Sequence, residues 1–224
     1  MRIAERAPRE TGREYALRVL RDNIVRLELA PGSMVSENEL AAQMGLSRTP
    51  VREALIELSR TRIVEIYPQR GSAVALIDHD RVEEARFVRS VLECAVAGLA
   101  CEMAAPAQLA QLEENVRLQE FYLENRSDDK LMELDNAFHR MLFDATNKLQ
   151  TYALLDGLTV HFDRVRSLSL TTVKDLKIVA DHRAILEAIR AKDAAEAAHR
   201  MEKHLARYKI DEQSVQEKYP QYFK

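Results

Sequence analysis

Residues 46–55 read Leu-Ser-Arg-Thr-Pro-Val-Arg-Glu-Ala-Leu, and this stretch predicts the first turns of a helix. Ser47 or Thr49 can accept a hydrogen bond from the free backbone N–H groups at a helix start. Pro50 suits the first turn, because the hydrogen bond that proline cannot donate has no acceptor within the helix at that position. We therefore expect a helix that begins near Ser47.

Two arginines give this helix a basic face. Arg48 and Arg52 are four residues apart and project from one side, whereas Val51, Leu55 and Leu58 lie on another side. The apolar side would pack on a small core and leave the arginines exposed near the N-terminal end of the helix. Such a helix can enter the major groove of DNA by that end. Taken alone, the two arginines fit equally well an ordinary surface helix with weak ion pairs.

The preceding segments complete a helix-turn-helix. A helix with an apolar stripe starts near Thr11 and ends before Pro31-Gly32. A second, short helix starts at Ser36, whose side chain can cap it. Gly45 then turns the chain sharply into the helix that begins near Ser47. Two short helices joined by a tight turn that contains glycine are typical of a helix-turn-helix.

A β-hairpin is predicted directly after these helices. Residues 63–67 and 73–76 are two β-rich runs, separated by the turn-forming cluster 68–72. Arg70 lies at the tip of this hairpin, where it can reach a phosphate or the minor groove of DNA. A hairpin in this position is the wing of a winged helix-turn-helix.

The run from Pro31-Gly32 through Ser47–Leu55 to Arg70-Gly71 resembles the GntR family of bacterial transcriptional regulators. Asn38 departs from the pattern, because some members carry at its position an arginine that contacts DNA. Thr61-Arg62-Ile63 departs as well, since it replaces the Glu-Gly-Leu that is usual before the first strand of the wing. The residues that this resemblance assigns to DNA binding are Asn38, Ser47, Arg48, Thr49, Arg52, Arg70 and Gly71.

Everything after Ile77 is predicted to be helical. The apolar periodicity indicates six helices with short connections, at about 78–103, 106–125, 128–145, 148–168, 173–191 and 193–210. The tail after about residue 211 is expected to lie loose or to dock on the surface. The predicted fold is therefore mainly α, with a winged helix-turn-helix domain at 1–77 and an antiparallel helical bundle at 78–224.

Four side chains of this second domain can converge on a metal ion. Asp135 and His139 are i and i+4 on one predicted helix, and His182 and His204 lie on two others. One carboxylate and three imidazoles can bind a divalent metal ion in the core of a bundle. The spacing alone fits ordinary buried or surface histidines as well. The other histidines, His79, His161 and His199, are interpreted as surface or helix-terminal residues. Arg164 and Arg166 can line the effector cavity, but we interpret them as exposed to solvent.

The motifs of the second domain resemble FCD, the effector domain of the FadR branch of GntR regulators. These motifs are Arg89-x-x-x-Glu93, Asp135-x-x-Phe138-His139, Asn147, His182-x-x-Ile185-Leu186-x-Ala188-Ile189 and His204-Leu205. The resemblance implies a divalent metal ion on Asp135, His139, His182 and His204, with zinc as the first choice and nickel or manganese as alternatives. It also implies that Arg89 binds the carboxylate of an effector. Asn147 is a second effector-binding candidate or only a helix cap, and six helices suggest the VanR-like subgroup.

Composition excludes several other classes of protein. The chain has 224 residues, 31% of them charged, and a net charge of −3, which argues against a protein that coats nucleic acid generally. No apolar run approaches the roughly 18 residues of a membrane span, and the first ten residues lack the apolar core of a secretory signal. We expect a cytoplasmic protein. Cys94 and Cys101 are expected to be buried thiols.

These features predict a bacterial DNA-binding regulator, in particular a repressor, and not an enzyme. It would bind a pseudo-palindromic operator as a homodimer and respond to a small carboxylate effector at the metal site. One rival is a regulator with a purely structural metal site and no effector. The other is a metal-dependent hydrolase that uses Glu93 or Glu133 as its general base, with the winged helix as a targeting arm.

Overall fold

The computed structural model describes residues 1–155, 157–172 and 177–224, with the backbone alone at residue 171 and at residues 208–212. These residues form two units. The N-terminal unit comprises Met1–Val82 together with the short segments Val160–Ser167 and Val215–Lys224. The helical unit comprises Glu83–Thr159 and Leu168–Ser214. The first unit thus includes two segments that the predicted division at residue 77 assigns to the second domain.

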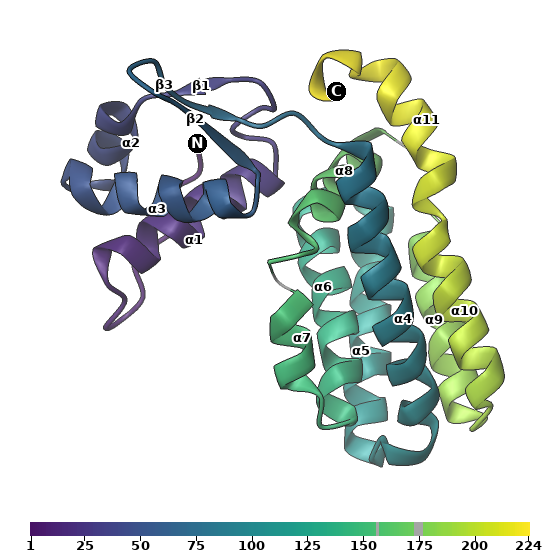
Figure 1. Ribbon diagram of the computed structural model, residues 1–224. Coiled ribbons are helices and arrows are strands. Elements are labelled where there is room, and N and C mark those ends of the chain that lie inside the picture. The colour runs from purple at the N-terminus through teal and green to yellow at the C-terminus, as the bar shows by residue number, and fades with distance from the viewer. Residues whose placement is uncertain (156, 173–176) are drawn as a thin grey trace. The chain divides into compact units, whose positions relative to one another are not determined.

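A winged helix-turn-helix forms around residues 46–55, which confirms the predicted fold of this part (Figure 1). Helix α3 packs on α1 and on strand β2. The sheet is antiparallel in the order β1-β3-β2. The two-residue strand β1 was not predicted, because a strand so short has no periodicity to detect. The elements are α1 (Gly12–Val25), β1 (Met34–Val35), α2 (Glu37–Met44), α3 (Arg48–Arg60), β2 (Val64–Tyr67) and β3 (Gly71–Val74).

The apolar face of α3 is buried as the sequence predicts. Val51, Leu55 and Leu58 join the core of the unit with Leu20 and Ile24 of α1. Helix α1 ends at Val25, well before Pro31-Gly32. It stops there because Leu27 adopts a left-handed conformation with φ 63°, in which the helix cannot continue.

Two left-handed residues fix the ends of the connections around α3. Gly45 (φ 64°) closes α2, and the next N–H, that of Leu46, bonds the carbonyl of Ala41 at 2.9 Å. Arg62 (φ 61°) closes α3 in the same way, with the N–H of Ile63 bonding the carbonyl of Leu58 at 3.3 Å. Both are Schellman motifs, in which a left-handed residue satisfies the last carbonyls of a helix. The arginine that replaces the usual glycine thus occupies a position that favours glycine.

The helical unit contains the predicted bundle with one correction. The segment predicted as a single helix at 148–168 forms two helices, α7 and α8, because the chain turns at residues 157–159 around Gly157. The described part of residues 79–206 therefore forms seven helices, so the count of six that suggested the VanR-like subgroup was wrong. The helices are α4 (His79–Met103), α5 (Pro106–Glu124), α6 (Asp128–Ala145), α7 (Leu149–Leu155), α8 (Val160–Thr172), α9 (Ile178–Arg190) and α10 (Ala194–Ala206).

The last two predicted features of this part also differ in detail. Residues 170–172, predicted as a break, belong to the end of α8, and residues 173–176 of the next predicted helix lie outside the described residues. The tail is ordered as α11 (Tyr208–Lys218) and a 3₁₀ turn, Pro220–Tyr222. Its end docks in the N-terminal unit, where Phe223 forms a parallel bridge with Ile77. None of the described helices is long and apolar enough to span a membrane.

Two arginines interpreted as exposed are buried in the structure. Arg164 is fully buried and donates to the carbonyl oxygen of Ala75, while Arg166 is 9% exposed and paired with Asp163 at 2.7 Å. That interpretation was wrong because the sequence of one helix does not reveal the groups that other segments bring to it. His161 lies in the first turn of α8 but is buried, with its Nε2 2.9 Å from the carbonyl oxygen of Thr61, and burial lowers its pKa to about 4.

Replacement of Arg62 by glycine should stabilise the N-terminal unit. A left-handed conformation costs an L-residue about 1–2 kcal/mol, and glycine recovers part of this cost, although its unfolded chain is more flexible. We expect Arg62→Gly to raise the free energy of unfolding by up to about 1 kcal/mol, measured by thermal melting. The matched control is Arg60→Gly in the last helical turn of α3, which should destabilise by about 1 kcal/mol. Equal destabilisation by both changes would contradict the strain at Arg62.

Candidate functional site

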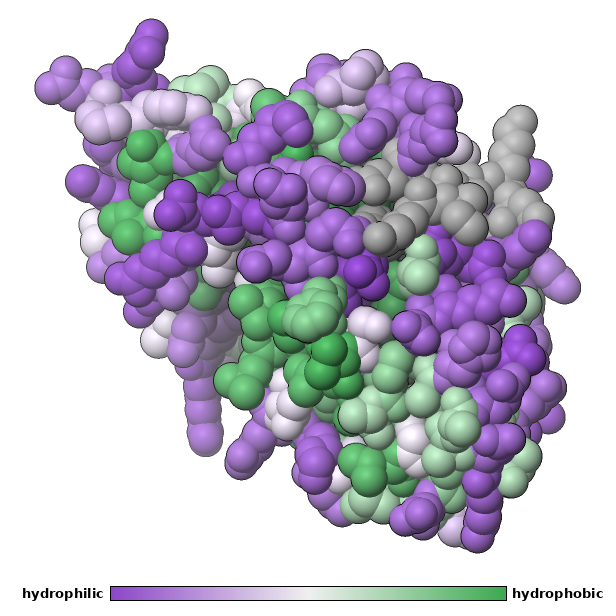
Figure 2. All heavy atoms as spheres, turned by 45° about the vertical axis from the view of Figure 1, so that its right-hand side comes forward, coloured by the Kyte–Doolittle hydropathy of each residue, from purple (hydrophilic) through white to green (hydrophobic). Residues whose placement is uncertain are grey.

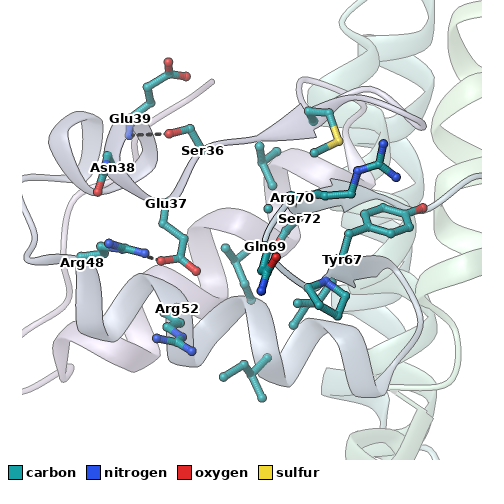
Figure 3. A pocket seen from close by; sticks show the side chains of 17 residues that line it. Ser36, Glu37, Asn38, Glu39, Arg48, Arg52, Tyr67, Gln69, Arg70 and Ser72 are labelled. Atoms are coloured by element: carbon teal, nitrogen blue, oxygen red, sulfur yellow. Dashed lines mark hydrogen bonds and ion pairs between the residues drawn. The ribbon is translucent and has the colours of Figure 1, made fainter.

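A groove of about 760 Å³ lies between α2, the first turns of α3 and the wing. Figure 3 shows Arg48 and Arg52 on α3 and Arg70 at the tip of the wing, with the guanidinium of Arg70 directed away from the two arginines of α3; all three line the groove. Asn38 and Gly71 also line the groove. Ser47 and Thr49 are exposed at the start of α3 but are not among its lining residues. All seven residues predicted to bind DNA are thus exposed on one unit, and five of them share one groove.

Glu37 holds one of the two arginines of α3. Its Oε2 lies 2.6 Å from Nε of Arg48, as the dashed line in Figure 3 marks. Arg48 remains largely exposed, with 63% of its side chain accessible, so its terminal N–H groups face solvent. The sequence alone does not reveal Glu37 as the partner of Arg48, because the two residues lie on different helices.

The tip of the wing depends on one glycine. Gly71 has φ 99°, a conformation that side chains rarely adopt, and a Cβ added there would lie 3.6 Å from Cε of Met34. Gln69 is left-handed as well, with φ 61°. Two such residues on either side of Arg70 set the path of the tip. The structure therefore gives Gly71 a conformational reason for its place beside Arg70.

In the helical unit, Asp135, His139, His182 and His204 converge as predicted. One ligand atom from each side chain lies within 4.8 Å of the others, and all four residues are buried. Nε2 of His204 lies 3.2 Å from Nε2 of His139 and 3.3 Å from Nε2 of His182. Asp135 Oδ1 lies 3.6 Å from Nε2 of His182. Helices α6, α9 and α10 contribute these residues, so the cluster depends on the bundle as a whole.

Each histidine turns its other ring nitrogen, Nδ1, to an oxygen atom on a different helix. Nδ1 of His139 contacts Oε2 of Glu93 on α4. Nδ1 of His182 lies 2.7 Å from Oε1 of Gln119 on α5. Nδ1 of His204 lies 3.7 Å from Oδ2 of Asp181 on α9.

Because a carboxylate or an amide oxygen only accepts a hydrogen bond, a neutral imidazole beside one carries its proton on Nδ1 and its lone pair on Nε2. For His139 and His182 this assignment places the Nε2 lone pairs toward the centre of the cluster. The longer contact at His204 favours the same arrangement.

The outer carboxylates are held in their charged form. Burial would raise the pKa of Glu93, but Arg89 and His139 hold it below the ordinary value of a glutamate. Burial acts in the same direction on Asp181, yet hydrogen bonds from His204 and Arg207 lower its pKa to about 2. Burial lowers the pKa of His204 to about 4. This histidine is therefore neutral at neutral pH, as a metal ligand must be.

The donor set fits a divalent metal ion. Bonds of about 2.1 Å to a metal place neighbouring nitrogen ligands about 3.0–3.4 Å apart, depending on whether the geometry is octahedral or tetrahedral. The two Nε2 separations measured here lie in that range. The residues that would hold the ion are Asp135, His139, His182 and His204.

Arg89 and Asn147 occupy very different surroundings. Arg89 is 4% exposed, and its Nε donates to Oε1 of Glu93 at 2.6 Å. Asn147 is exposed in the turn after α6 with φ 56°, and the N–H of Lys148 bonds the carbonyl of Phe143 at 2.7 Å. This is again a Schellman motif, in which asparagine is common at the left-handed position. The local geometry thus gives Asn147 a capping role, and its effector-binding role stays a prediction.

The other residues weighed from the sequence lie outside the cluster or serve it indirectly. Glu133 is half-exposed and pairs with Lys130 at 2.7 Å. His79 and His199 are exposed, as predicted. Gln119 and Asp181 were missed. A signal for Gln119 was present, since Asn115 and Gln119 are polar residues four apart among the buried positions of α5.

Comparisons with known proteins agree with both units. Residues 14–74 match the family described as bacterial regulatory proteins, gntR family, and residues 84–207 match the FCD domain. The HTH-type transcriptional repressor RspR of Escherichia coli is 34% identical over 199 residues, covering 88% of this chain and 87% of the relative.

Two further proteins extend this likeness. An uncharacterized HTH-type transcriptional regulator from an unstable DNA locus of Streptomyces ambofaciens is 37% identical, covering 91% of this chain and 86% of that protein. The solved structure of E. coli McbR/YncC has the same fold, with a TM-score of 0.79 at 21% identity over 93% of this chain and 99% of that one. The chain therefore belongs to the GntR family of DNA-binding transcriptional regulators, in the group that carries an FCD domain.

Proposed function

We propose that this regulator is a repressor whose operator binding is controlled by a small carboxylate effector at a divalent metal ion. The observation that carries the proposal is the buried cluster of Asp135 with three inward-facing imidazoles. RspR, a relative that matches 88% of the chain, is itself named a transcriptional repressor. Zinc is the proposed ion, with nickel or manganese as alternatives. Such an ion supplies an open coordination position that a carboxylate oxygen or a water molecule can take.

The charge balance around the cluster supports an anionic effector. Glu93 is neutralised by Arg89, and Asp181 is neutralised by Arg207, whose guanidinium binds it through two nitrogens at 2.5 and 2.7 Å. Asp135 brings one further carboxylate into the cluster. Because histidine binds a metal ion as a neutral ligand, a divalent ion on these four residues would leave a net charge of +1, which favours a ligand that carries one negative charge. A ligand with two negative charges would need further cations around it.

Arg89 is the proposed second contact for the effector. It lies beside the cluster, because its Nε donates to Oε1 of Glu93 at 2.6 Å and Oε2 of the same carboxylate contacts Nδ1 of His139. The effector carboxylate would bind this guanidinium beside Glu93. A regulator with a purely structural metal site is the alternative. If that alternative holds, small acids would not alter DNA binding, and substitution of Arg89 by lysine would leave DNA regulation unchanged.

A homodimer is proposed from the exposed apolar surface of the helical unit. Phe87 and Val91 lie one turn apart on α4 and are 62% and 55% exposed. Leu154 and Leu158 are 73% and 54% exposed. Figure 2 shows hydrophobic atoms gathered in a patch at mid-height of the visible face. Exposed apolar clusters of this kind are typical of interaction surfaces. Two copies would present two winged helices to a pseudo-palindromic operator in the bacterial cytoplasm.

Control of DNA binding requires that the effector bind one arrangement of the dimer more tightly than another. Typical couplings between two sites are about 1–3 kcal/mol, or about 5- to 150-fold in affinity. We propose that the effector releases the operator, as expected for a repressor that answers to a substrate or product of the genes it controls.

Substitution of Arg52 by alanine should remove specific DNA binding without unfolding the protein. A bidentate arginine–guanine contact contributes about 1–3 kcal/mol of discrimination, so we expect specific affinity to fall about 5- to 150-fold on an operator selected from random duplexes. Arg60→Ala is the matched control, because Arg60 is an exposed arginine at the far end of the same helix. An Arg52→Ala protein that binds the operator as tightly as the control would refute the assignment.

Substitution of Phe87 and Val91 by serine should separate the proposed dimer. The mass of one chain is 25.6 kDa, and analytical ultracentrifugation should report twice this value for the unchanged protein. The double variant should sediment as a monomer, because it removes the two most exposed of the large apolar side chains on α4. Leu118→Ser, at a 37% exposed leucine on α5, is the control and should remain dimeric. A monomeric unchanged protein would rule out the dimer.

Removal of the metal should destabilise the protein and abolish its response to effector. A ligand present at a thousand times its Kd stabilises the folded state by about 4 kcal/mol, so chelation should lower the melting temperature and reloading should restore it. Asp135→Asn should abolish this effect, whereas His199→Asn at an exposed histidine should not. Monocarboxylic acids should bind only the metal-loaded protein, as calorimetry can measure, and be recovered unchanged. Conversion of the acid would instead support the hydrolase.

A further inference from the structure

We propose that Gln119, Glu93 and Asp181 are positioning residues that fix the orientation of the three histidines, and that Gln119 is the decisive one. Each would hold Nδ1 of one histidine and so direct its Nε2 lone pair to the centre of the cluster. The consequence for metal and effector binding rests on the proposed function. The orientation of the rings does not, because it is a property of the protein alone.

The side chain of Gln119 is fixed by its own partners. It is fully buried on α5, and its Nε2 donates to Oδ1 of Asn115 at 2.6 Å. Nδ2 of Asn115 donates in turn to the carbonyl oxygen of Leu134 on α6 at 3.1 Å. Because the amide nitrogen of Gln119 faces an acceptor, its oxygen must face His182. The amide pair therefore forms a bridge from α6 through α5 to α9.

The packing around His182 holds its ring in one orientation. Its exposed fraction is 0%, and its ring is stacked on Phe138 with the ring centroids 4.2 Å apart and the planes 19° apart. Nδ1 lies 2.7 Å from an oxygen that can only accept a hydrogen bond. His182 must therefore carry its proton on Nδ1, and its Nε2 is left as an acceptor that faces His204 at 3.3 Å. That nitrogen is ready to bind a cation without a proton being displaced from it.

The three positioning residues differ in charge. Glu93 and Asp181 are carboxylates, and each is matched by its own arginine, Arg89 or Arg207. Gln119 is neutral, and its partner Asn115 is neutral as well. A glutamate at position 119 would also accept the hydrogen bond of His182, but it would add a negative charge with no arginine bound to it. We infer that the amide preserves the positive charge of the loaded site and with it the affinity for an anionic ligand.

The orientation of His182 can be tested in the metal-free protein by NMR. Two-bond ¹H–¹⁵N spectra of protein labelled with ¹⁵N-histidine, recorded at pH 8, distinguish a ring protonated on Nδ1 from one protonated on Nε2. Single-histidine substitutions assign the signals. We expect His182 in the Nδ1–H form in the unchanged protein and in Gln119→Glu, and a mixture of both forms in Gln119→Leu. Gln111→Leu, at an exposed position of the same helix, is the matched control.

Metal affinity provides the second measurement. Loss of an outer hydrogen bond to a metal-binding histidine typically costs about 10- to 100-fold in affinity, so Gln119→Leu should bind zinc that much more weakly in a chelator competition. Gln119→Glu should bind zinc at least as tightly as the unchanged protein and monocarboxylates more weakly. Should Gln119→Leu fail to fold, Asn115→Ala should shift His182 toward the same mixture of forms. This variant removes the shorter of the two hydrogen bonds that hold the amide nitrogen of Gln119 and leaves only the one to Leu134 at 3.5 Å.

The outcomes separate this inference from the proposed function. An Nδ1–H form of His182 that persists unchanged in Gln119→Leu and Asn115→Ala would overturn the positioning role. If the tautomer shifts as expected but the unchanged protein binds no metal, the positioning role stands and the metal-controlled regulator fails. If both measurements follow the expectation, Gln119 acts through His182 and not through general stability, because Gln119→Glu restores the spectrum.

Discussion

The structure of the helical unit depends on the burial of one carboxylate. Asp135 is fully buried, and so is the ring of His182 beside it. A buried charge costs several kcal/mol unless hydrogen bonds and opposite charge surround it. Imidazoles from three helices surround this one, and each is held in turn by a group on a further helix. One polar centre thus joins five helices of the unit: α4, α5, α6, α9 and α10. The apolar residues around it must pack in a way that preserves these contacts.

Glu93 and Asp181, the two carboxylates outside the cluster, each lie between a histidine and an arginine. Each therefore holds a histidine without adding net charge to the cluster. The arrangement also gives the burial of Arg89 a reason, because its charge balances that of Glu93. This arginine therefore supports the histidines through Glu93, in addition to the contact with the effector that we propose for it.

Local signals in the sequence predicted most of the fold, and the resemblance to FCD supplied the four residues of the cluster. The start of α3, the wing around Gly71 and the i, i+4 pair of Asp135 and His139 are all set by neighbours along the chain. The residues that escaped prediction depend on contacts between distant segments. Gln119 has meaning only when α5 lies against α9, and Glu37 only when α2 lies against α3. The division of 148–168 into two helices escaped for another reason, because a single glycine in a periodic stretch is often tolerated within a helix.

Gly45 and Arg62, the two left-handed residues on either side of α3, fix the number of residues between the end of α2 and the start of the wing. Each residue of a helix adds 1.5 Å and turns the next side chain by about 100°. One residue inserted between these two closures would rotate the wing away from the basic face of α3 and misalign the two surfaces that line the groove. The number of residues in this segment is therefore set by the groove that α3 and the wing form together, whereas the side chains on its exposed face can differ without changing that number.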